Sequence, residues 1–466
     1  MQRLLLLPFA PRPGDPDGNA ARIAAALRQA ARADLLVLPR AALTGAPLGD
    51  LGRQPDFLAG CEACLRRLAA LTAGGGPGLL LGALWPERGP DGGAAREGAV
   101  LIDGGRILAR RATHAPPGEA PDPPVPAPGL APGPAPGPMA FRGLRLGVLT
   151  GADAEDPAVA ETLAETGAEL LLHLRARPFD GAPPDGAIDR AVARVVETGL
   201  PWLSLGLLGS AEGLVFPGGA FALNADRRLA ARLPDFTPEA LPVTLEAKAG
   251  GWRAGMAPLP PEETAMDRLW RALCCGLRAE ILAGGHDGIT VATEGEAAPL
   301  LAALAAACAP GRPGPRQPEP RHPGPRHPGP RRPLRLHGLD KTAMALELRA
   351  VGGSGAGAGE GFAPLRDLWR GEWAALARAR GLPAPPADAA LEAVLEALLR
   401  GEKGVDAIAA GGYDPAGVRS LWRRMLAAEA ARRRAPPGLR LSGRAFGHDR
   451  RYPPALPGPD EPDEWA

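Results

Sequence analysis

The chain has 466 residues, a length that corresponds to two or three average domains. Its 53 basic and 52 acidic side chains give a formal net charge of +1, which excludes a global basic field for nucleic acid and an acidic field for cationic partners. The 63 glycines and 56 prolines approach a low-complexity composition, but 45% of the residues are hydrophobic and can build a sizeable core. Because only 4% are aromatic, we expect a core of Ala, Leu and Val.

The sequence favours a cytoplasmic protein. No apolar run reaches the roughly 18 residues that a membrane span needs, and the apolar start MQRLLLLPFAPRPGD is more typical of a buried strand than of a signal peptide. The cysteines show no disulfide-framework spacing, which suits a reducing compartment. They are Cys61, Cys64, Cys274, Cys275 and Cys308. The Cys61-x-x-Cys64 pair lacks a second pair or a histidine to complete a zinc site, so we expect a structural role for it.

Strand and helix patterns alternate through the first half of the chain. Apolar strand-like runs followed by amphipathic helices predict a sheet covered by helices. The expected strands are residues 4–8, 34–39, 78–84, 98–103, 144–149, 169–174 and 202–207, with a hairpin at 220–229. The expected helices are 19–33, 55–71, 157–166 and 187–198. We predict a layered α/β domain over residues 1–245.

Two stretches interrupt this pattern. Residues 115–138 are nearly all Pro, Ala and Gly, and residues 310–333 contain a tandem PRHPG and six arginines. Both are predicted to be extended and solvated, because proline removes backbone donors and glycine adds flexibility. The second could contact an acidic surface, although a plain linker is favoured.

A second, helix-rich α/β unit is predicted for residues 246–309 and 334–453, followed by a polar tail at 454–466. Its expected strands are 288–293 and 334–336, and residues 352–361 are rich in glycine. Its expected helices are 262–282, 297–308, 364–380, 389–400, 405–410 and 415–434.

Segments through nearly the whole chain match one family in the family's own order. In the first half they are GDPDGNAARI (14–23), LIDGGRI (101–107), FRGLRLGV (141–148), LAETGAELLL (163–172), AVARVVETGLP (191–201) and ALNADRRLAARLP (222–234). In the second half they are GFAPLRDLW (361–369), YDPAGVRSLWRRML (413–426) and RRRAPPGLRLSGRAFGHDRRYP (432–453). With these segments the chain resembles bacterial glutamine-dependent NAD(+) synthetases.

The resemblance implies a nitrilase-like α-β-β-α sandwich with glutaminase activity, joined to a smaller, truncated, Rossmann-like adenine-nucleotide alpha hydrolase (PP-loop) domain. In that family the first domain hydrolyses glutamine, and the ammonia passes to the second. The second uses ATP and magnesium to adenylate deamido-NAD, and ammonia then displaces AMP to give NAD. The implied partners are these small molecules and further copies of the chain or an intact synthetase, with no nucleic acid and no membrane.

The glutaminase chemistry needs a thiolate nucleophile, a glutamate base and a lysine near the developing oxyanion. At the positions that the resemblance assigns to the Glu, Lys and Cys, this chain has Arg40, Thr113 and Gly151. Arginine cannot accept a proton and glycine cannot form a thioester. Thr150 is an alternative nucleophile, but it would need an adjacent base. The family's glutamine-site turn Asn-x-Ser-Pro is replaced here by residues 175–178, with the sequence RARP.

The synthetase half is substituted in the same way. Where the resemblance places the pyrophosphate loop Ser-Gly-Gly-x-Asp-Ser, this chain has Glu294, Gly295, Glu296, Ala297, Ala298 and Pro299. Each carboxylate there would repel a phosphate oxygen by about 4 kcal/mol at 4 Å and an effective dielectric near 20. The Gly-Asp-Met-Asn-Gly-Gly-Phe loop has become GAGAGEGF (355–362), without its aspartate.

A few polar residues of the second half could still bind the nucleotide. By resemblance, the cofactor-binding candidates are Gly295, Asp340, Lys341 and Thr342, with no metal ligand among them. Lys341 can equally be a solvated surface lysine. Retention of ATP and Mg²⁺ is therefore in question.

Because the matches fall on packing elements and the mismatches on reacting groups, the sequence favours a family member with both sites lost, acting as a scaffold or as a partner of an intact synthetase. One alternative is an active synthetase with a rearranged site. Another is a sensor that keeps a nucleotide- or NAD-binding pocket.

Overall fold

The computed structural model describes residues 1–87, 95–114, 130, 132–182, 185–291, 295–309, 332–346, 361–400 and 403–453. The Pro-rich stretches expected at 115–138 and 310–333 lie mostly outside these residues, as do Glu294, nearly all of the glycine-rich 352–361, and the tail 454–466.

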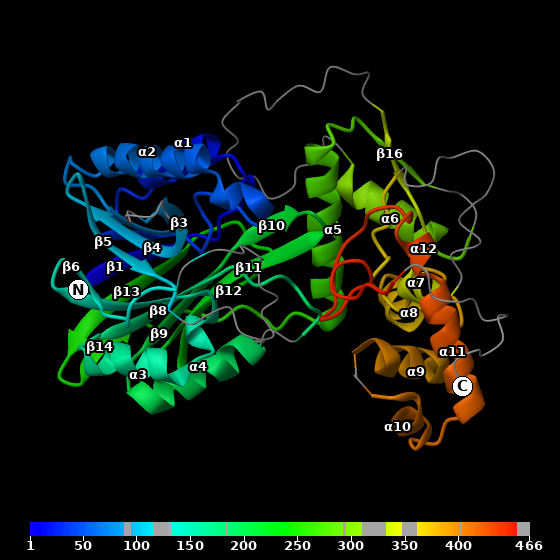
Figure 1. Ribbon diagram of the computed structural model, residues 1–466. Helices are drawn as coiled ribbons and strands as arrows, with labels where there is room; N and C mark the ends of the chain where they lie inside the picture. Colours follow the sequence, from blue (N-terminus) through cyan, green and yellow to red (C-terminus); the bar gives the residue numbers. More distant parts are fainter. Residues whose placement is uncertain are drawn as a thin grey trace.

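The first half is built from two sheets that pack face to face (Figure 1). The first has the strand order β14-β13-β1-β2-β3-β4-β5. Its strands are β1 (Gln2–Leu6), β2 (Leu35–Val37), β3 (Gly78–Pro86), β4 (Ala95–Asp103), β5 (Arg106–Ala112), β13 (Leu241–Lys248) and β14 (Gly251–Ala254). The second has the order β10-β11-β9-β8-β7-β6, with β12 paired to β11. Its strands are β6 (Met139–Phe141), β7 (Leu144–Thr150), β8 (Leu170–Arg175), β9 (Trp202–Gly206), β10 (Leu208–Ala211), β11 (Leu214–Leu223) and β12 (Leu229–Asp235).

Helices cover the outer face of each sheet. Helices α1 (Pro16–Gln29) and α2 (Pro55–Leu71) pack on the first sheet, and α3 (Pro157–Glu165) and α4 (Asp185–Thr198) pack on the second (Figure 1). The buried cluster between the sheets consists almost entirely of Leu, Val and Ala, as the composition predicts. The expected α-β-β-α sandwich is therefore confirmed.

Parallel pairing fixes which residues gather at one edge of the sandwich. Strand β2 is parallel to β1 and β3, and β7, β8 and β9 are parallel to one another. The residues that follow the carboxyl ends of β2, β7 and β8 therefore meet in one region, and the end of β5 comes in beside them. This edge holds the substituted glutaminase positions.

The Cys61-x-x-Cys64 pair is structural in the fold. Both side chains are fully buried in the cluster between α2 and the first sheet. Burial raises the pKa of Cys61 to about 12 and that of Cys64 to about 11, so both stay protonated thiols at neutral pH. Among the described residues, no group of three or more His, Cys, Asp or Glu side chains could hold a metal ion.

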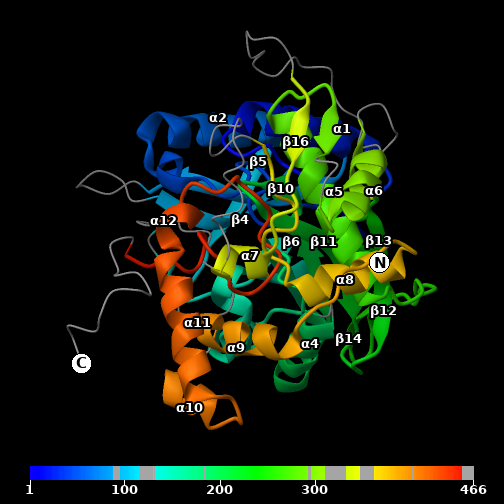
Figure 2. The same cartoon turned by 90° about the vertical axis from the view of Figure 1, so that its right-hand side faces the viewer.

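The second half contains a small β-α-β unit and a group of helices. Strands β15 (Ile289–Val291) and β16 (Leu334–Leu336) are parallel, and α6 (Ala298–Cys308) lies between them in sequence. The other helices are α7 (Lys341–Leu346), α8 (Arg370–Ala379), α9 (Ala389–Arg400), α10 (Val405–Ala409), α11 (Pro415–Ala427) and α12 (Glu429–Arg432). Figure 2 shows α8, α9, α10 and α11 together on the side away from the sandwich. The β-α-β unit fits the Rossmann-like fold that was expected.

The long helix α5 (Ala265–Ala283) stands between the two halves and packs against β10 and β11 (Figure 1). A single buried cluster combines α5 with side chains from both halves, including Phe179 and Leu208 of the first and Leu336 of the second. The carboxyl-terminal segment makes a second contact between the halves, in which the Arg440 amide donates a hydrogen bond to the Gly213 carbonyl at 2.8 Å. The two halves are therefore joined by core packing as well as by the chain.

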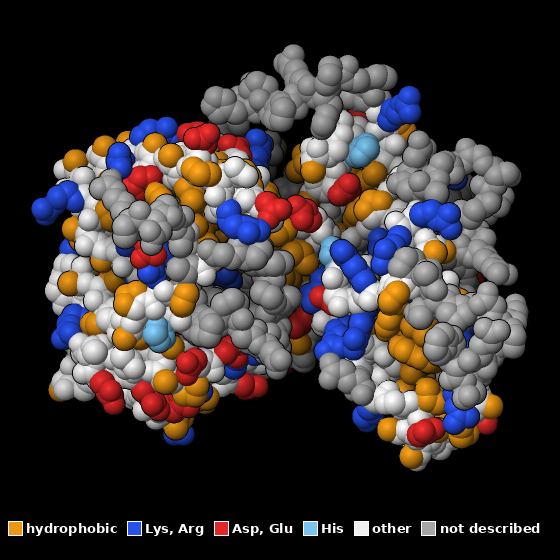
Figure 3. Space-filling view, viewed as in Figure 1, with side chains coloured by type: hydrophobic (Ala, Val, Ile, Leu, Met, Phe, Trp, Pro, Cys, Tyr) orange, Lys and Arg blue, Asp and Glu red, His pale blue; other side chains and the backbone are white. Residues whose placement is uncertain are grey.

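Surface charge follows the near-neutral composition. Acidic and basic side chains are interspersed over the first half, while basic side chains gather on the second half where it faces the first (Figure 3). None of the helices in the described ranges combines the length and apolar content needed to cross a membrane.

Several expected boundaries need correction. The first sheet includes β13 and β14 and continues to Ala254, past residue 245, where the first domain was expected to end. The sequence did not predict these two strands, because β13 alternates apolar and polar residues and β14 begins with glycine. Strand β5 was missed because its sequence RILARRA carries three arginines. The helix expected at 364–380 begins only at Arg370, since Phe362 and Ala363 form β-bridges and Trp369 is the N-cap residue.

Candidate functional sites

Arg40, which the resemblance places at the family's catalytic glutamate, is held in a bidentate ion pair. It follows the carboxyl end of β2, and its Nε and Nη2 donate to the two carboxylate oxygens of Glu97 on β4, at 2.8 and 2.7 Å. The side chains are only 17% and 12% exposed, so water screens the pair weakly. The Glu97 carboxylate therefore neutralises the charge of Arg40.

Gly151 lies directly against this pair. Its φ of +57° is in the left-handed region, and a Cβ placed there would lie 3.3 Å from the Arg40 Cζ. The structure thus brings the general-base and nucleophile positions together, as the resemblance requires. The Arg40 guanidinium fills the space beside the point from which a nucleophilic side chain would project.

Thr113 and Thr150 complete the cluster. Their hydroxyl oxygens are 2.8 Å apart, and the Thr113 amide donates to the Glu97 carbonyl at 2.9 Å. Thr150 is fully buried, and a second hydroxyl is not a base that could deprotonate it. The Thr113 hydroxyl therefore does not supply the adjacent base that Thr150 would need to act as a nucleophile.

The turn after β7 is fixed by a buried carboxylate, Asp153. Its Oδ2 accepts from Arg111 Nη1 at 2.7 Å and from the Thr150 amide at 3.2 Å, and its Oδ1 accepts from the His114 amide at 2.8 Å. The Asp153 and Arg111 side chains are 0% and 6% exposed. These bonds fix the shape of the turn that contains Gly151.

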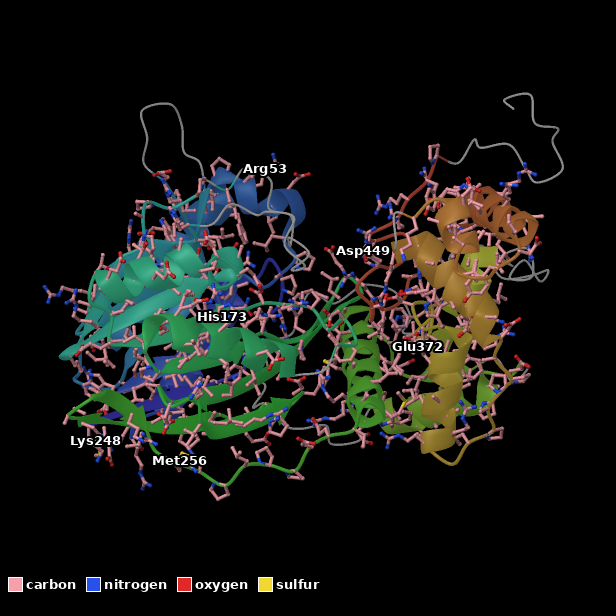
Figure 4. All side chains as sticks on the ribbon, turned by 90° about the horizontal axis from the view of Figure 1, so that it is seen from below. Arg53, His173, Lys248, Met256, Glu372 and Asp449 are labelled. Atoms are coloured by element: carbon pink, nitrogen blue, oxygen red, sulfur yellow. The ribbon has the colours of Figure 1, made fainter. Side chains whose placement is uncertain are left out.

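His173 of β8 lies near the same edge, inside the first half (Figure 4). Burial, followed by the positive charges of Arg175 and Arg190, lowers its pKa well below the usual value, although a hydrogen bond with the Gly151 backbone acts in the opposite direction. Its ring packs edge-on against Trp202 with the centroids 5.6 Å apart. His173 is therefore a neutral imidazole.

In the second half, the degenerate loop before α6 also forms an arginine–glutamate contact. Glu296 Oε2 lies 3.6 Å from Arg370 Nη1, and Arg370 Nε lies 3.2 Å from Asp340 Oδ2. Gly295 is exposed with a φ of +106°, and Glu294 lies outside the described residues. The Glu296 side chain is 55% exposed, so this contact is looser than that of Arg40.

Lys341 is neither solvated nor available to a ligand, which corrects the surface alternative. It is 1% exposed, and its Nζ lies 2.8 Å from Ser442 Oγ, 2.8 Å from the Arg444 carbonyl and 3.0 Å from Asp367 Oδ1. An ammonium has three donors, and all three are used. Lys341 therefore holds the carboxyl-terminal segment to the second half.

The neighbouring candidates are also engaged in internal contacts. Asp340 is 2% exposed, and its carboxylate accepts from the Ala343 amide at 2.8 Å and from Trp373 Nε1 at 3.0 Å. Thr342 is buried and donates to Glu392 at 3.4 Å. Asp340, Lys341 and Thr342 lie together at the start of α7, whereas Gly295 joins them only through Glu296 and Arg370.

Sequence reasoning missed the partners of these substituted residues. Glu97 and Arg370 lie far along the chain from Arg40 and Glu296, and nothing in a single sequence pairs them. Asp367 gave a weak signal as an acidic residue inside the matching segment GFAPLRDLW. These partners neutralise the charges of Arg40, Lys341 and Glu296 with groups of the chain itself.

Comparisons with known proteins agree with this geometry. No protein-family profile matches the chain. It is 28% identical to the glutamine-dependent NAD(+) synthetase of Rhodobacter capsulatus, across 97% of this chain and 98% of that protein. It is 25% identical to the enzyme of the same name from Xanthomonas campestris pv. campestris, across 92% of each. Its fold matches the glutamine-dependent NAD+ synthetase of Acinetobacter baumannii, solved with adenosine diphosphate, with a TM-score of 0.65 and 18% identity over 97% of this chain and 98% of that chain.

The chain has the two-part α/β architecture in which an α-β-β-α sandwich precedes a Rossmann-like unit. It is similar to glutamine-dependent NAD(+) synthetases over nearly its whole length, which confirms the resemblance.

Proposed function

We propose that this chain is a non-catalytic homologue of glutamine-dependent NAD(+) synthetase that acts as a scaffold or as a partner subunit of an intact synthetase. The observation that carries the proposal is the Arg40–Glu97 pair beside Gly151. A fixed cation stands where the base is needed, it is neutralised internally, and it lies against a residue that has no nucleophile.

Hydrolysis of glutamine at this edge would require three groups that the site lacks. Arg40 cannot take a proton, Gly151 cannot form a covalent bond to the substrate, and Thr113 carries no charge to stabilise an oxyanion. The Thr150 hydroxyl lies 2.8 Å from the Thr113 hydroxyl, which is not a base, so we infer that it does not replace the thiolate. We infer that the first half supplies no ammonia.

The residues present in the second half do not fit ATP and magnesium in the way the family reaction needs. Ala298 has no carboxylate to bind the metal, and Glu296 places negative charge at the loop that should receive pyrophosphate. Arg370 offsets part of that charge, but the Lys341 ammonium is fully used inside the protein. We therefore derive no adenylation step for this chain.

What the chain retains is the architecture that joins the two halves. The cluster around α5 and the Arg440–Gly213 hydrogen bond fix the sandwich against the second half without any reacting group. Surfaces that serve assembly can persist when catalysis is lost. We propose a cytoplasmic role in which this chain binds copies of itself or an intact synthetase.

The test is an activity assay with separate arms for the two halves. Purified protein is given glutamine alone, ammonia with ATP, Mg²⁺ and deamido-NAD, and the complete mixture, with an intact glutamine-dependent synthetase as positive control. We expect no glutamate and no NAD above the background without enzyme. NAD formation in the complete mixture would overturn the proposal and favour an active enzyme with a rearranged site.

Two further measurements separate the possible non-catalytic roles. Affinity purification of the tagged chain with an intact synthetase present tests the partner role, and the synthetase should elute with it. Calorimetry with ATP and with NAD at millimolar concentration should show no saturable heat. If calorimetry shows saturable binding of ATP or NAD and no synthetase co-purifies, the scaffold role is contradicted and a nucleotide-sensor role is favoured.

A further inference from the structure

An arginine-lined pocket lies where the sandwich meets α5. Its walls come from the loop after β8, the first turn of α4, strands β11 and β12, and one residue of α5. Its volume is about 90 Å³, several times the roughly 10–15 Å³ that one water needs on the same measure. Arg40, Thr113 and Gly151 are not among its described lining residues, but Arg175, Arg177 and Pro178 belong to the turn at 175–178, where the resemblance places the family's glutamine-site turn. The pocket therefore lies beside the candidate glutaminase site.

The described lining carries more positive than negative charge. Its acidic residues are Asp180 and Asp235. Its basic residues are Arg175, Arg177, Arg190, Arg232 and Arg268. Such an excess in a concave, partly desolvated site attracts anions more strongly than the same charges would on an open surface.

The ion pairs at the pocket fix the arginines in place. Arg177 lies 2.8 Å from Asp180, and Arg268 donates to Asp235 at 2.7 and 3.2 Å. Although burial raises the pKa of the Asp180 carboxyl, hydrogen bonds from Arg177 and from the Ala182 amide hold it below its usual value, so the carboxylate stays charged. Arg268 also donates from Nη1 to the Ala182 carbonyl at 2.8 Å, which fixes its guanidinium at the pocket wall.

Arg232 pairs with no carboxylate among the described residues. It lies on β12, opposite Phe221 of β11, and its side chain is half-buried at the pocket wall. It makes no ion pair with any residue in the part of the chain that the structure describes. A partly desolvated guanidinium without a counter-ion gains most from a bound anion.

The first turn of α4 adds to the same field. Gly186, Ala187 and Ile188 line the pocket, so the amino-terminal end of a 14-residue helix faces it. The amides of a first helical turn carry partial positive charge and have no partner within the helix. The helix and the arginines therefore attract a ligand of the same sign.

We propose that this pocket binds a small anion with a phosphate or carboxylate group, and that Arg232 is its principal charged contact. Because Arg268 comes from α5 and the other arginines come from the sandwich, a bound anion contacts both halves of the chain. The proposal does not rest on the loss of catalysis, since Arg232 and Arg268 lie outside the substituted positions Arg40, Thr113 and Gly151, although Arg175 and Arg177 belong to the turn at 175–178.

The experiment is isothermal titration calorimetry of the full chain with inorganic phosphate and, separately, with succinate, in buffers matched for ionic strength with chloride. The variants are Arg232→Gln, Arg232→Lys and the control Arg53→Gln, whose arginine pairs with Asp50 away from the pocket. We expect saturable binding by the native chain, about tenfold weaker in Arg232→Gln, partly restored in Arg232→Lys and unchanged in Arg53→Gln. Circular dichroism establishes that each variant is folded.

The outcomes decide both the existence and the identity of the site. Phosphate binding alone assigns it to phosphorylated ligands, succinate binding alone to carboxylates, and binding of both to small anions in general. Saturable heat from neither anion overturns the proposal. Equal weakening in Arg232→Gln and Arg53→Gln, or no weakening in Arg232→Gln, overturns the assignment to this pocket.

Discussion

The two candidate sites differ in how their substituted residues are paired. In the first half, Arg40 and Glu97 form two short hydrogen bonds in a site where the side chains are less than one-fifth exposed. In the second, the Glu296–Arg370 contact is 3.6 Å long, with side chains 55% and 32% exposed. The Arg40–Glu97 pair is therefore short and largely shielded from water, whereas the Arg370–Glu296 contact is longer and more exposed.

This difference shows what reversal would require. Restoring the first site needs the removal of a buried ion pair as well as the return of three side chains, because the Arg40 guanidinium lies against the Gly151 Cβ position. In the second site, the Lys341 ammonium is not available to bind a nucleotide, because it donates to Ser442 and to the Arg444 carbonyl of the carboxyl-terminal segment. A matching residue in sequence is therefore weak support for a matching role.

The largest effect is expected from breaking the Lys341–Asp367 pair. In Asp367→Asn, a fully buried ammonium loses its counter-ion, and the free energy of unfolding should fall by about 3–5 kcal/mol. Urea denaturation measures it, with Lys248→Ala as the control, because Lys248 is 58% exposed and forms a surface pair with Glu246. A change below about 1 kcal/mol in Asp367→Asn would show that Lys341 is not structural and would reopen the question of a ligand contact.

The second prediction compares the two arginine–glutamate contacts directly. Glu97→Gln removes a charged acceptor from a part-buried bidentate pair and should cost about 1.5–3 kcal/mol. Glu296→Gln makes the same chemical change at an exposed contact and should cost about 0–1 kcal/mol. Equal losses in urea denaturation would contradict the distinction between a shielded and an exposed pair.

The sequence predicts the layers better than the sites. Helix 55–71, helix 389–400 and strand 334–336 are found at the expected residues, because Pro55 marks a helix start and the apolar spacing is unambiguous. Strand β5 was missed because three arginines mask its pattern, and two of them form ion pairs across the fold: Arg110 with Glu62 and Arg111 with Asp153. Local pattern fails where tertiary partners make a polar strand stable.

The positions of the lost groups could be predicted, but their replacements' contacts could not. The resemblance placed Arg40 and Gly151 at one site, and the parallel strands bring them together. That Glu97 neutralises Arg40, or that Lys341 is buried against Asp367, depends on residues many positions away. Contacts between distant ionic groups carry no local signature, so a single sequence leaves a cation's partner open.

The third prediction concerns Gly151. Gly151→Cys returns the family's nucleophile, but the left-handed φ of +57° and the nearby Arg40 should cost about 1–2 kcal/mol of stability. It should also release no glutamate from glutamine, because the base and lysine positions stay substituted. Gly60→Ala, in the middle of α2 with open space at its Cβ, is the opposite control and should stabilise the chain by about 0.5–1 kcal/mol. Glutaminase activity in Gly151→Cys would mean that the first site is far less closed than its geometry indicates.

The fourth prediction uses one histidine with a lowered pKa in each half, His173 and His448. Burial lowers the pKa of His173 well below 6.5 and, with Arg366, lowers that of His448. Between the folded-state pKa and 6.5 the unfolded chain binds a proton that the folded chain does not, so stability falls as the pH drops below about 6.5. Each histidine contributes at most about 1.4 kcal/mol per pH unit over that interval.

Replacing each histidine by glutamine in turn measures how much each one contributes to the pH dependence of the free energy of unfolding. His173→Gln should flatten the fall in unfolding free energy between pH 6.5 and pH 5 more than His448→Gln, because the pKa of His173 is lowered further and the interval over which it acts is wider. Urea denaturation at several pH values measures both slopes. The cationic edge around Gly151, with Arg40 and Arg175 near His173, would then be the part of the molecule most sensitive to acid. A steeper effect from His448→Gln would move that sensitivity to the junction with the second half.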